Sequence, residues 1–501
     1  MVDGNRGECR CSAVSTGLKM GNGVGRFLSI GVLILLCIFQ RHASAGTPQQ
    51  IRKPQQIESE AKERFLAALD AYKAHRYSAA QTQLETLVKS FPEDFEMTEL
   101  LGLVYVAQGK QQQANHLLVK AVQLRPKTAE ARTALATNFL SIHRVHEAEE
   151  QFKKVIELEP ESYDANHNLG EFYIQTAKLA DAVPFLKRAQ EIDPNAYNNG
   201  YDLALALEQT GQLDEARKQV HKLISVRDSA ELHSLLGEIE EKSRNYLSSA
   251  AQYEQAVRSD PSEQNILNWG AELLLHQTFA PAIEVFKAGI SRFPQSAQLH
   301  NGLGIAFYGA GQMDDAVRAF LRASDLSPSD PLPLTFLGKG CDGASPELAA
   351  QIRSRLQNSI GRYSKNADLN YYLAVCLWRG NQIQSTTDLA GQVEYLLKRA
   401  QTLDPNYADA YFQLGNLYAE QHRLNDAIDQ YERALKVNST SANFHYRLGQ
   451  VLARAGKSDR AQAEFAIFER LRKSETDVTN KEQNQIKQFV YTMRRSGPGQ
   501  Q

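Results

Sequence analysis

Residues 405–418 read Pro-Asn-Tyr-Ala-Asp-Ala-Tyr-Phe-Gln-Leu-Gly-Asn-Leu-Tyr, and this segment contains the pattern that decides the fold. Within it, Leu414 directly precedes the small residue Gly415. A small residue in the same context recurs along the chain, most often every 34 residues, at Ala68, Gly102, Ala136, Gly170, Ala204, Gly237, Gly270, Gly304, Gly338, Ala374, Gly415 and Gly449. A fixed period of this length is the sequence signature of a repeat architecture.

Three further positions share this period. A second small residue follows the first by 12 positions, as at Ala182 and Ala427, and a bulky apolar residue follows four positions later, as at Leu186 and Tyr431. Eight of the 16 prolines then close the unit. Because residues four apart lie on one helical face, each unit is expected to be a helical hairpin. One hairpin cannot bury its apolar face alone, so the hairpins should stack into a solenoid.

The pattern resembles the tetratricopeptide repeat, a helix–turn–helix unit of about 34 residues. The resemblance covers about twelve units over residues 58–472. It implies an all-α, right-handed superhelical solenoid of about twelve helix–turn–helix repeats with a C-terminal capping helix. It also implies that the concave groove, lined by the first helix of each repeat, binds extended peptides or helices.

Two neighbouring repeats depart from the pattern. The first contains residues that should shorten or break its first helix, namely Gly338, Gly340, Gly343 and Pro346. The second has about seven extra polar residues near Gln382–Asp388, which favour a long loop. We therefore expect an N-terminal array at 58–337, irregular repeats at 338–392 that separate two arms, and C-terminal repeats at 393–472.

The segments outside the repeats are expected to differ in structure. Residues 46–57 are polar and predict a linker. Residues 473–501 are expected to form a capping helix and a tail. In that segment, apolar residues fall on one helical face, namely Ile486, Phe489, Val490 and Met493.

The N-terminal leader predicts export. The apolar run at 27–39 has 13 residues, which is short for a bilayer span of about 20. Arg26 precedes the run and Ala43-Ser44-Ala45 follows it, which is typical of a secretory signal peptide at 1–45. Met20 is an alternative start, which would make residues 1–19 an extension. The protein should be periplasmic or secreted; the alternative is a membrane anchor formed by an uncleaved leader.

Two cysteines, Cys341 and Cys376, lie outside the leader. Both occupy apolar positions of expected helices, so we expect two buried free thiols. The alternative is a disulfide between neighbouring helices, which an oxidising compartment would allow.

Composition and motifs favour binding over catalysis. The formal net charge of −2 gives no basic excess for nucleic acid or an anionic membrane. No phosphate-binding glycine loop or paired CxxC motif occurs, and His143 and His146 fall in an expected turn. We therefore expect no enzyme, no catalytic residues, no cofactor and no metal site.

A candidate ligand groove lies in the last repeats. Aromatic residues three positions before the small residue, acids one turn earlier and one tryptophan would form a strip of Asp368, Tyr371, Trp378, Asp409, Phe412 and Tyr446. Exposed aromatic rings are typical binding anchors, although the same rings could be buried between helices. Acids in the first helical turn could attract a basic ligand or only favour the helix dipole. The predicted groove lacks a basic row that would hold a terminal carboxylate.

The sequence therefore predicts an exported, non-catalytic scaffold that binds protein or peptide segments. The alternative is a module that binds a cell-envelope glycan or polymer and assists polysaccharide export. The partner's identity stays open at this stage.

Overall fold

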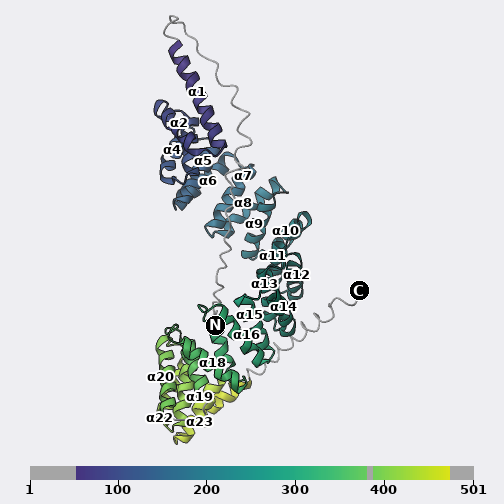
Figure 1. The fold of residues 1–501 in the computed structure, drawn as a ribbon, viewed down its shortest axis with the longest axis vertical. Helices are drawn as coiled ribbons and strands as arrows, with labels where there is room; N and C mark the ends of the chain where they lie inside the picture. The colour runs from purple at the N-terminus through teal and green to yellow at the C-terminus, as the bar shows by residue number, and fades with distance from the viewer. Residues whose placement is uncertain (1–51, 381–386, 474–501) are drawn as a thin grey trace, which may run out of the picture. The chain divides into compact units, whose positions relative to one another are not determined.

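The computed structural model describes residues 52–380 and 387–473 (Figure 1). Every regular element within these residues is helical. The helices are α1 (Arg52–Lys73), α2 (Tyr77–Ser90), α3 (Phe95–Ala107), α4 (Gln111–Leu124), α5 (Ala129–Ser141), α6 (Val145–Leu158), α7 (Tyr163–Gln175), α8 (Leu179–Ile192), α9 (Tyr197–Gln209), α10 (Leu213–Val226), α11 (Ala230–Lys242), α12 (Tyr246–Ser259), α13 (Glu263–Leu275), α14 (Phe279–Arg292), α15 (Ala297–Gly309), α16 (Met313–Leu326), α17 (Leu332–Gly340), α18 (Pro346–Ser359), α19 (Ala367–Gly380), α20 (Thr387–Leu403), α21 (Ala408–Glu420), α22 (Leu424–Val437) and α23 (Ala442–Arg454). Residues 458–473 are also helical.

The chain forms two compact units, Met1–His143 and Arg144–Gln501. The first unit contains α1–α5, and the second contains α6–α23 and residues 458–473. Within each unit, helices that follow one another in sequence pack side by side, and alternate helices such as α1 and α3 or α21 and α23 also touch. This is the predicted stack of helical hairpins.

Each hairpin depends on a small residue facing a large one. A Cβ atom on Gly304 of α15 would lie 2.5 Å from Cε1 of Phe320 on α16, and one on Gly415 of α21 would lie 2.7 Å from Cε1 of Tyr431 on α22. Both rings are almost completely buried. The two predicted positions of the period therefore meet at the helix crossing, where only a small residue lets the helices approach.

The irregular repeats do not interrupt the core. As predicted, α17 is short, ending at Gly340, and α18 begins at Pro346. However, one cluster of buried residues runs from Ala316 through the irregular part to Ala461. The units divide between α5 and α6, which does not coincide with 338–392, so the separation of two arms there stays a prediction. Proline is tolerated at the start of a helix, and α17 stays long enough to contact α16, α18 and α19.

Some of the predicted segments are described by the structure only in part, and others lie entirely outside the described residues. The linker predicted at 46–57 is too long, because α1 already begins at Arg52; Pro54 lies in the first helical turn, where its missing N–H costs nothing. Thr387 and Asp388 begin α20, while residues 381–386 of the predicted loop lie outside the described residues. The leader at 1–45 and the capping segment from 474 also lie outside them.

The structure joins Cys341 and Cys376 in a disulfide, with Cα atoms 5.8 Å apart. Our prediction of two free thiols is therefore wrong, although both residues are buried as expected. The reason is the short α17, which ends just before Cys341 and packs against α19, where Cys376 lies. The bridge thus links the first helices of two successive repeats.

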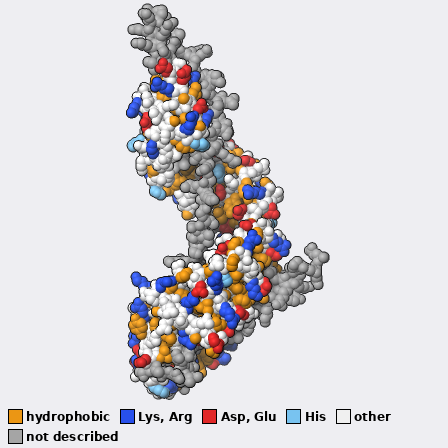
Figure 2. Space-filling view, viewed as in Figure 1, with side chains coloured by type: hydrophobic (Ala, Val, Ile, Leu, Met, Phe, Trp, Pro, Cys, Tyr) orange, Lys and Arg blue, Asp and Glu red, His pale blue; other side chains and the backbone are white. Residues whose placement is uncertain are grey.

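The described surface has no large region of one charge on the face shown in Figure 2, where basic and acidic side chains are interspersed. Among the described helices, none has the length and apolar character needed to cross a membrane.

Candidate ligand groove

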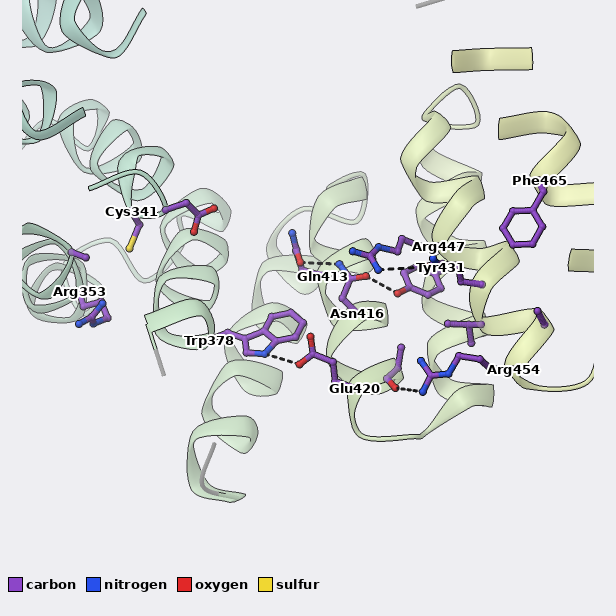
Figure 3. Close-up of a pocket in the computed structure, with 16 residues that line it drawn as sticks. Cys341, Arg353, Trp378, Gln413, Asn416, Glu420, Tyr431, Arg447, Arg454 and Phe465 are labelled. Carbon is purple, nitrogen blue, oxygen red and sulfur yellow. Dashed lines mark hydrogen bonds between the residues drawn. The ribbon is translucent and has the colours of Figure 1, made fainter. Parts of the chain in front are cut away.

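A cavity of about 890 Å³ lies in the second unit, among the last repeats (Figure 3). Most of its wall comes from α21 and α23, the first helices of two successive repeats, and Trp378 of α19 and two residues of α18 add to it. The lining residues are Cys341, Asp342, Ala349, Arg353, Trp378, Gln413, Asn416, Ala419, Glu420, Tyr431, Arg447, Gln450, Val451, Ala453, Arg454 and Phe465.

The lining follows the repeat register. On α21 the cavity residues lie at positions −2, +1, +4 and +5 from Gly415, and on α23 the same four positions from Gly449 line it. These offsets fall on one helical face, because residues three and four apart are neighbours on a helix. Trp378 occupies the +4 position of α19. The concave surface is thus defined by one face of each first helix.

Hydrogen bonds hold several of these side chains in place. Trp378 Nε1 donates to Glu420 Oε2 at 3.2 Å. The hydroxyl of Tyr431 donates to Asn416 Oδ1 at 2.6 Å, and Asn416 Nδ2 donates to Gln413 Oε1 at 3.0 Å (Figure 3). The bond from Trp378 connects α19 to α21, that from Tyr431 connects α22 to α21, and that between Asn416 and Gln413 lies within α21, so these bonds restrain the indole ring and the amide groups in the cavity wall.

Three arginines give the cavity its charge. Arg447 donates to Gln450 Oε1 at 3.3 Å, and Arg454 donates to the carbonyl oxygen of Ala419 at 3.4 Å. Within the described residues, neither of these guanidinium groups, nor that of Arg353, forms an ion pair with a carboxylate. With Asp342 and Glu420 as the acids, the lining has a formal excess of one positive charge.

Two of these arginines act on the pKa of Tyr431, which also lines the cavity. Burial raises the pKa of Tyr431, while Arg447 and Arg454 oppose this increase and Glu420 adds to it. Charged side chains of both α21 and α23 therefore influence the Tyr431 hydroxyl. A guanidinium without a carboxylate partner is suited to bind a carboxylate in two parallel hydrogen bonds.

Family models for the tetratricopeptide repeat match this chain at 65–127, 143–197, 177–239, 276–331 and 396–429, and a TPR repeat model matches 415–456. Together the matches cover more than half of the sequence. The chain belongs to the tetratricopeptide repeat family. The matches include α21, α22 and α23, which supply most of the cavity wall, while the lining residues from Cys341 to Trp378 lie outside the matched segments. No curated protein matches the chain.

Solved structures also resemble this tetratricopeptide repeat chain. The complex of Naa15 and Naa10 bound to HypK is 16% identical over 82% of this chain and 68% of that chain, with a TM-score of 0.38. The Cut9–Hcn1 hetero-tetramer is 15% identical over 85% and 96%, with a TM-score of 0.37. Yeast Tom70 is 14% identical over 81% and 97%, with a TM-score of 0.36. At these values the likeness carries no information about the partners of this chain.

Of the six residues predicted from the sequence, Trp378 lines the cavity, and the other five do not. Phe412 corrects the prediction most clearly, because it is only 6% exposed. Its ring stacks on Phe444 with centroids 4.5 Å apart and lies 5.7 Å from the ring of Tyr431. Tyr446 is partly exposed and packs on Phe468.

The remaining three residues belong to a different contact network. Tyr371 packs between the rings of Tyr372 and Tyr407, with centroids 5.1 and 5.0 Å away. Burial and then the charge of Asp368, which hydrogen-bonds Tyr407, raise the pKa of that tyrosine. Asp409 is exposed at the start of α21. The six predicted residues therefore do not form one strip: Phe412 is a core ring, Asp368 and Tyr371 belong to the tyrosine cluster, Asp409 and Tyr446 are exposed to different degrees, and Trp378 lines the cavity.

The arginines lie at helical positions that the sequence-based prediction did not use. It used the positions six and three before the small residue, together with Trp378 four positions after it, whereas the cavity is lined at −2, +1, +4 and +5. The signal was present at those offsets, since Arg447 and Arg454 flank Gly449 at −2 and +5.

Proposed function

We propose that this chain is a non-catalytic scaffold that binds a protein or peptide segment in the cavity lined by α19, α21 and α23. The observation that supports this most strongly is the combination of a fixed indole ring with three guanidinium groups that have no carboxylate partner among the described residues. The lining contains no histidine or serine, and its one cysteine, Cys341, is in the disulfide, so no Ser–His or Cys–His pair is present there.

The cavity chemistry favours an acidic segment. Arg447 and Arg454 can each bind a carboxylate in planar, bidentate geometry. Trp378 offers a large ring surface that can cover an apolar side chain at small entropic cost. We therefore propose a ligand with a carboxylate next to an apolar residue, in place of the basic ligand that the sequence analysis expects.

A glycan or envelope polymer is the alternative ligand. Sugars stack on exposed aromatic rings, but in the lining Tyr431 is fully buried, which leaves Trp378 and Phe465 as the available rings. The two ligand classes differ in salt response, because screening weakens contacts between exposed charges and leaves ring stacking almost unchanged.

The test is selection from a random peptide library on the full chain, followed by affinity measurement. We expect enriched peptides to contain Asp or Glu and to bind more weakly at high salt. Trp378→Ala and Arg447→Gln should each lower the affinity at least about tenfold. Arg433→Gln is the matched control, because Arg433 pairs with Asp429 outside the cavity. Equal binding by all variants would contradict the proposal.

We also propose that the protein is exported after cleavage behind Ala45. The signal-peptide pattern supports this, and the disulfide is of a kind that persists in oxidising compartments. Intact-mass measurement of the protein from culture fractions should find Gly46 at the N-terminus. A chain that keeps Met1 or Met20 in the membrane fraction would instead indicate an anchor.

A further inference from the structure

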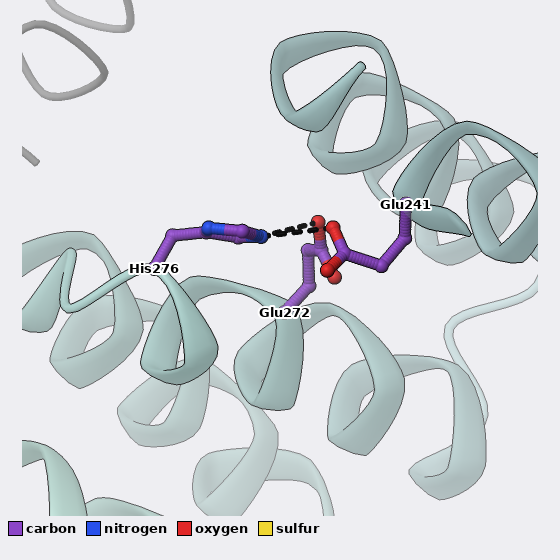
Figure 4. A group of neighbouring side chains, drawn as sticks. All are labelled: Glu241, Glu272 and His276. Carbon is purple, nitrogen blue, oxygen red and sulfur yellow. Dashed lines mark hydrogen bonds and ion pairs between the residues drawn. The ribbon is translucent and has the colours of Figure 1, made fainter. Parts of the chain in front are cut away.

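A partly buried cluster of two carboxylates and one imidazole lies in the second unit, far in sequence from the ligand cavity. It consists of Glu241 from α11, Glu272 from α13 and His276, which directly follows α13, and its candidate ligand atoms all lie within 4.8 Å of one another (Figure 4). His276 Nε2 lies 2.9 Å from Oε2 of Glu241 and 3.4 Å from Oε1 of Glu272.

The repeat architecture brings the three residues together. Glu272 and His276 are four positions apart, so they lie on one face of the same helical segment. Glu241 lies 35 residues before His276, at nearly the equivalent place on the preceding first helix. Because α11 and α13 touch, the three side chains point toward one another from two successive repeats (Figure 4).

Glu272 is poorly satisfied for its burial. The residue is only 5% exposed, and within the described part of the chain its buried Oε1 accepts no hydrogen bond. Its contact with His276 Nε2, at 3.4 Å, is longer than the 2.9 Å contact between that nitrogen and Glu241, and it is an ion pair only while the imidazole is protonated. Burying a carboxylate oxygen without a hydrogen bond is costly, so a bound cation would stabilise it.

The residues on either side of Glu241 in sequence have partners of their own. Glu240 forms an ion pair with Arg217 at 2.6 Å, and Lys242 pairs with Glu208. Among the ion pairs of the described residues, the imidazole of His276 is the basic group that faces both Glu241 and Glu272.

We propose that Glu241, Glu272 and His276 bind a divalent transition-metal ion of the Zn²⁺ class. Zinc bonds to histidine nitrogen and carboxylate oxygen are about 2.0–2.2 Å long, so neighbouring ligand atoms of a tetrahedral site lie roughly 3.3 Å apart. The observed distances of 2.9 and 3.4 Å are close to that separation. The mixed nitrogen and oxygen set suits Zn²⁺, whereas Ca²⁺ and Mg²⁺ prefer oxygen ligands alone.

Neighbouring residues favour this geometry. The ring of Tyr246 lies 4.3 Å from that of His276, centroid to centroid, and packs against the imidazole. The side chain of Glu241 is 26% exposed, so solvent reaches the cluster from its side and water can complete the coordination. The ion would connect two successive repeats and neutralise the buried Glu272.

The test uses Co²⁺ and then Zn²⁺, titrated into the full chain after dialysis against a chelator. We expect one Co²⁺ per chain, with the visible absorption of a four- or five-coordinate ion, and its displacement by Zn²⁺. His276→Gln and Glu272→Gln should each weaken Co²⁺ binding at least about tenfold.

Two further variants make the result decisive. His445→Gln is the matched control, because His445 pairs with a single carboxylate, Glu464, at 2.5 Å; this variant should keep the full Co²⁺ signal. Glu241→Gln, at the more exposed position, tests the site if the other variants fail to fold by circular dichroism. Absence of saturable binding in the wild type, or an unchanged signal in the folded variants, would overturn the proposal and leave an imidazolium between two carboxylates.

Discussion

A Cβ atom on Gly170 of α7 would lie 2.5 Å from Cδ2 of Leu186 on α8. Leu186 is completely buried, so it has no free space into which it could move. The same relationship holds between Gly270 and Phe286, where the distance would be 2.3 Å. The small residue of each repeat therefore sets how closely the two helices of a hairpin approach.

Gly170→Ala should consequently destabilise the second unit. The added methyl group overpacks the crossing, which costs about 1–3 kcal/mol in the free energy of unfolding. The helical Gly391 of α20 is the control, because nothing lies within 4 Å of its Cβ position. Gly391→Ala should stabilise by up to about 1 kcal/mol through helix propensity. Thermal and chemical unfolding followed by circular dichroism measure both, and equal effects of the two variants would contradict the crossing geometry.

Phe412→Ala should reduce stability whether or not a ligand is present. Because the ring is buried against Phe444 and Tyr431, its loss should cost about 3–5 kcal/mol in the free energy of unfolding. Tyr446→Ala, at a partly exposed ring, should cost only about 1 kcal/mol. An unchanged melting temperature for Phe412→Ala would instead indicate that the ring is not part of the core and would support its predicted place in the ligand groove.

The disulfide gives a chemical prediction. Alkylation of the denatured, unreduced protein should leave Cys341 and Cys376 unmodified, and a digest should contain the linked peptides. Replacing both residues by alanine should lower the free energy of unfolding by about 2–4 kcal/mol, because the bridge closes a loop of 35 residues. Alkylation of both cysteines without a reductant would show that the thiols are free.

The fold follows from the sequence because its determinants are local and periodic. Gly415 and Tyr431 lie 16 positions apart in one hairpin, so the 34-residue pattern alone predicts that they meet. The division between α5 and α6 has no comparable signal, because His143 and Arg144 occupy an ordinary interhelix turn of the period. The packing of α17 on α19, which brings Cys341 to Cys376, also depends on how far a broken helix extends.

The sites are harder to predict because they depend on helix rotation. Consecutive residues differ by about 100° around the helix axis, so moving from position −3 to position −2 replaces the buried Phe412 with the cavity residue Gln413. Similarly, Glu241 and His276 lie in different repeats, and only the packing of α11 on α13 shows that they meet.

The final prediction concerns pH and the first unit. The pKa of Glu99 on α3 is raised to about 7, by burial first and then by the negative charges of Glu130 and Glu96, with Arg125 opposing them. The unfolded chain should release this proton near the ordinary value of 4.5. The folded state therefore binds the proton more tightly, so the stability that Glu99 contributes is fully present below about pH 4.5 and is lost as the pH rises through 7.

Glu99→Gln removes this loss, since the amide stays neutral. Its free energy of unfolding should match that of the wild type near pH 4 and exceed it by about 1–2 kcal/mol at pH 8, a value reduced for the partial exposure of the side chain. Denaturant titrations of both proteins at a series of pH values measure the difference. Glu63→Gln, at an exposed position of α1, should show no such pH-dependent gain. A constant difference between Glu99→Gln and wild type from pH 4 to 8 would mean that the pKa of Glu99 is the same in the folded and unfolded states, and that burial and the acids of α3 and α5 do not raise it.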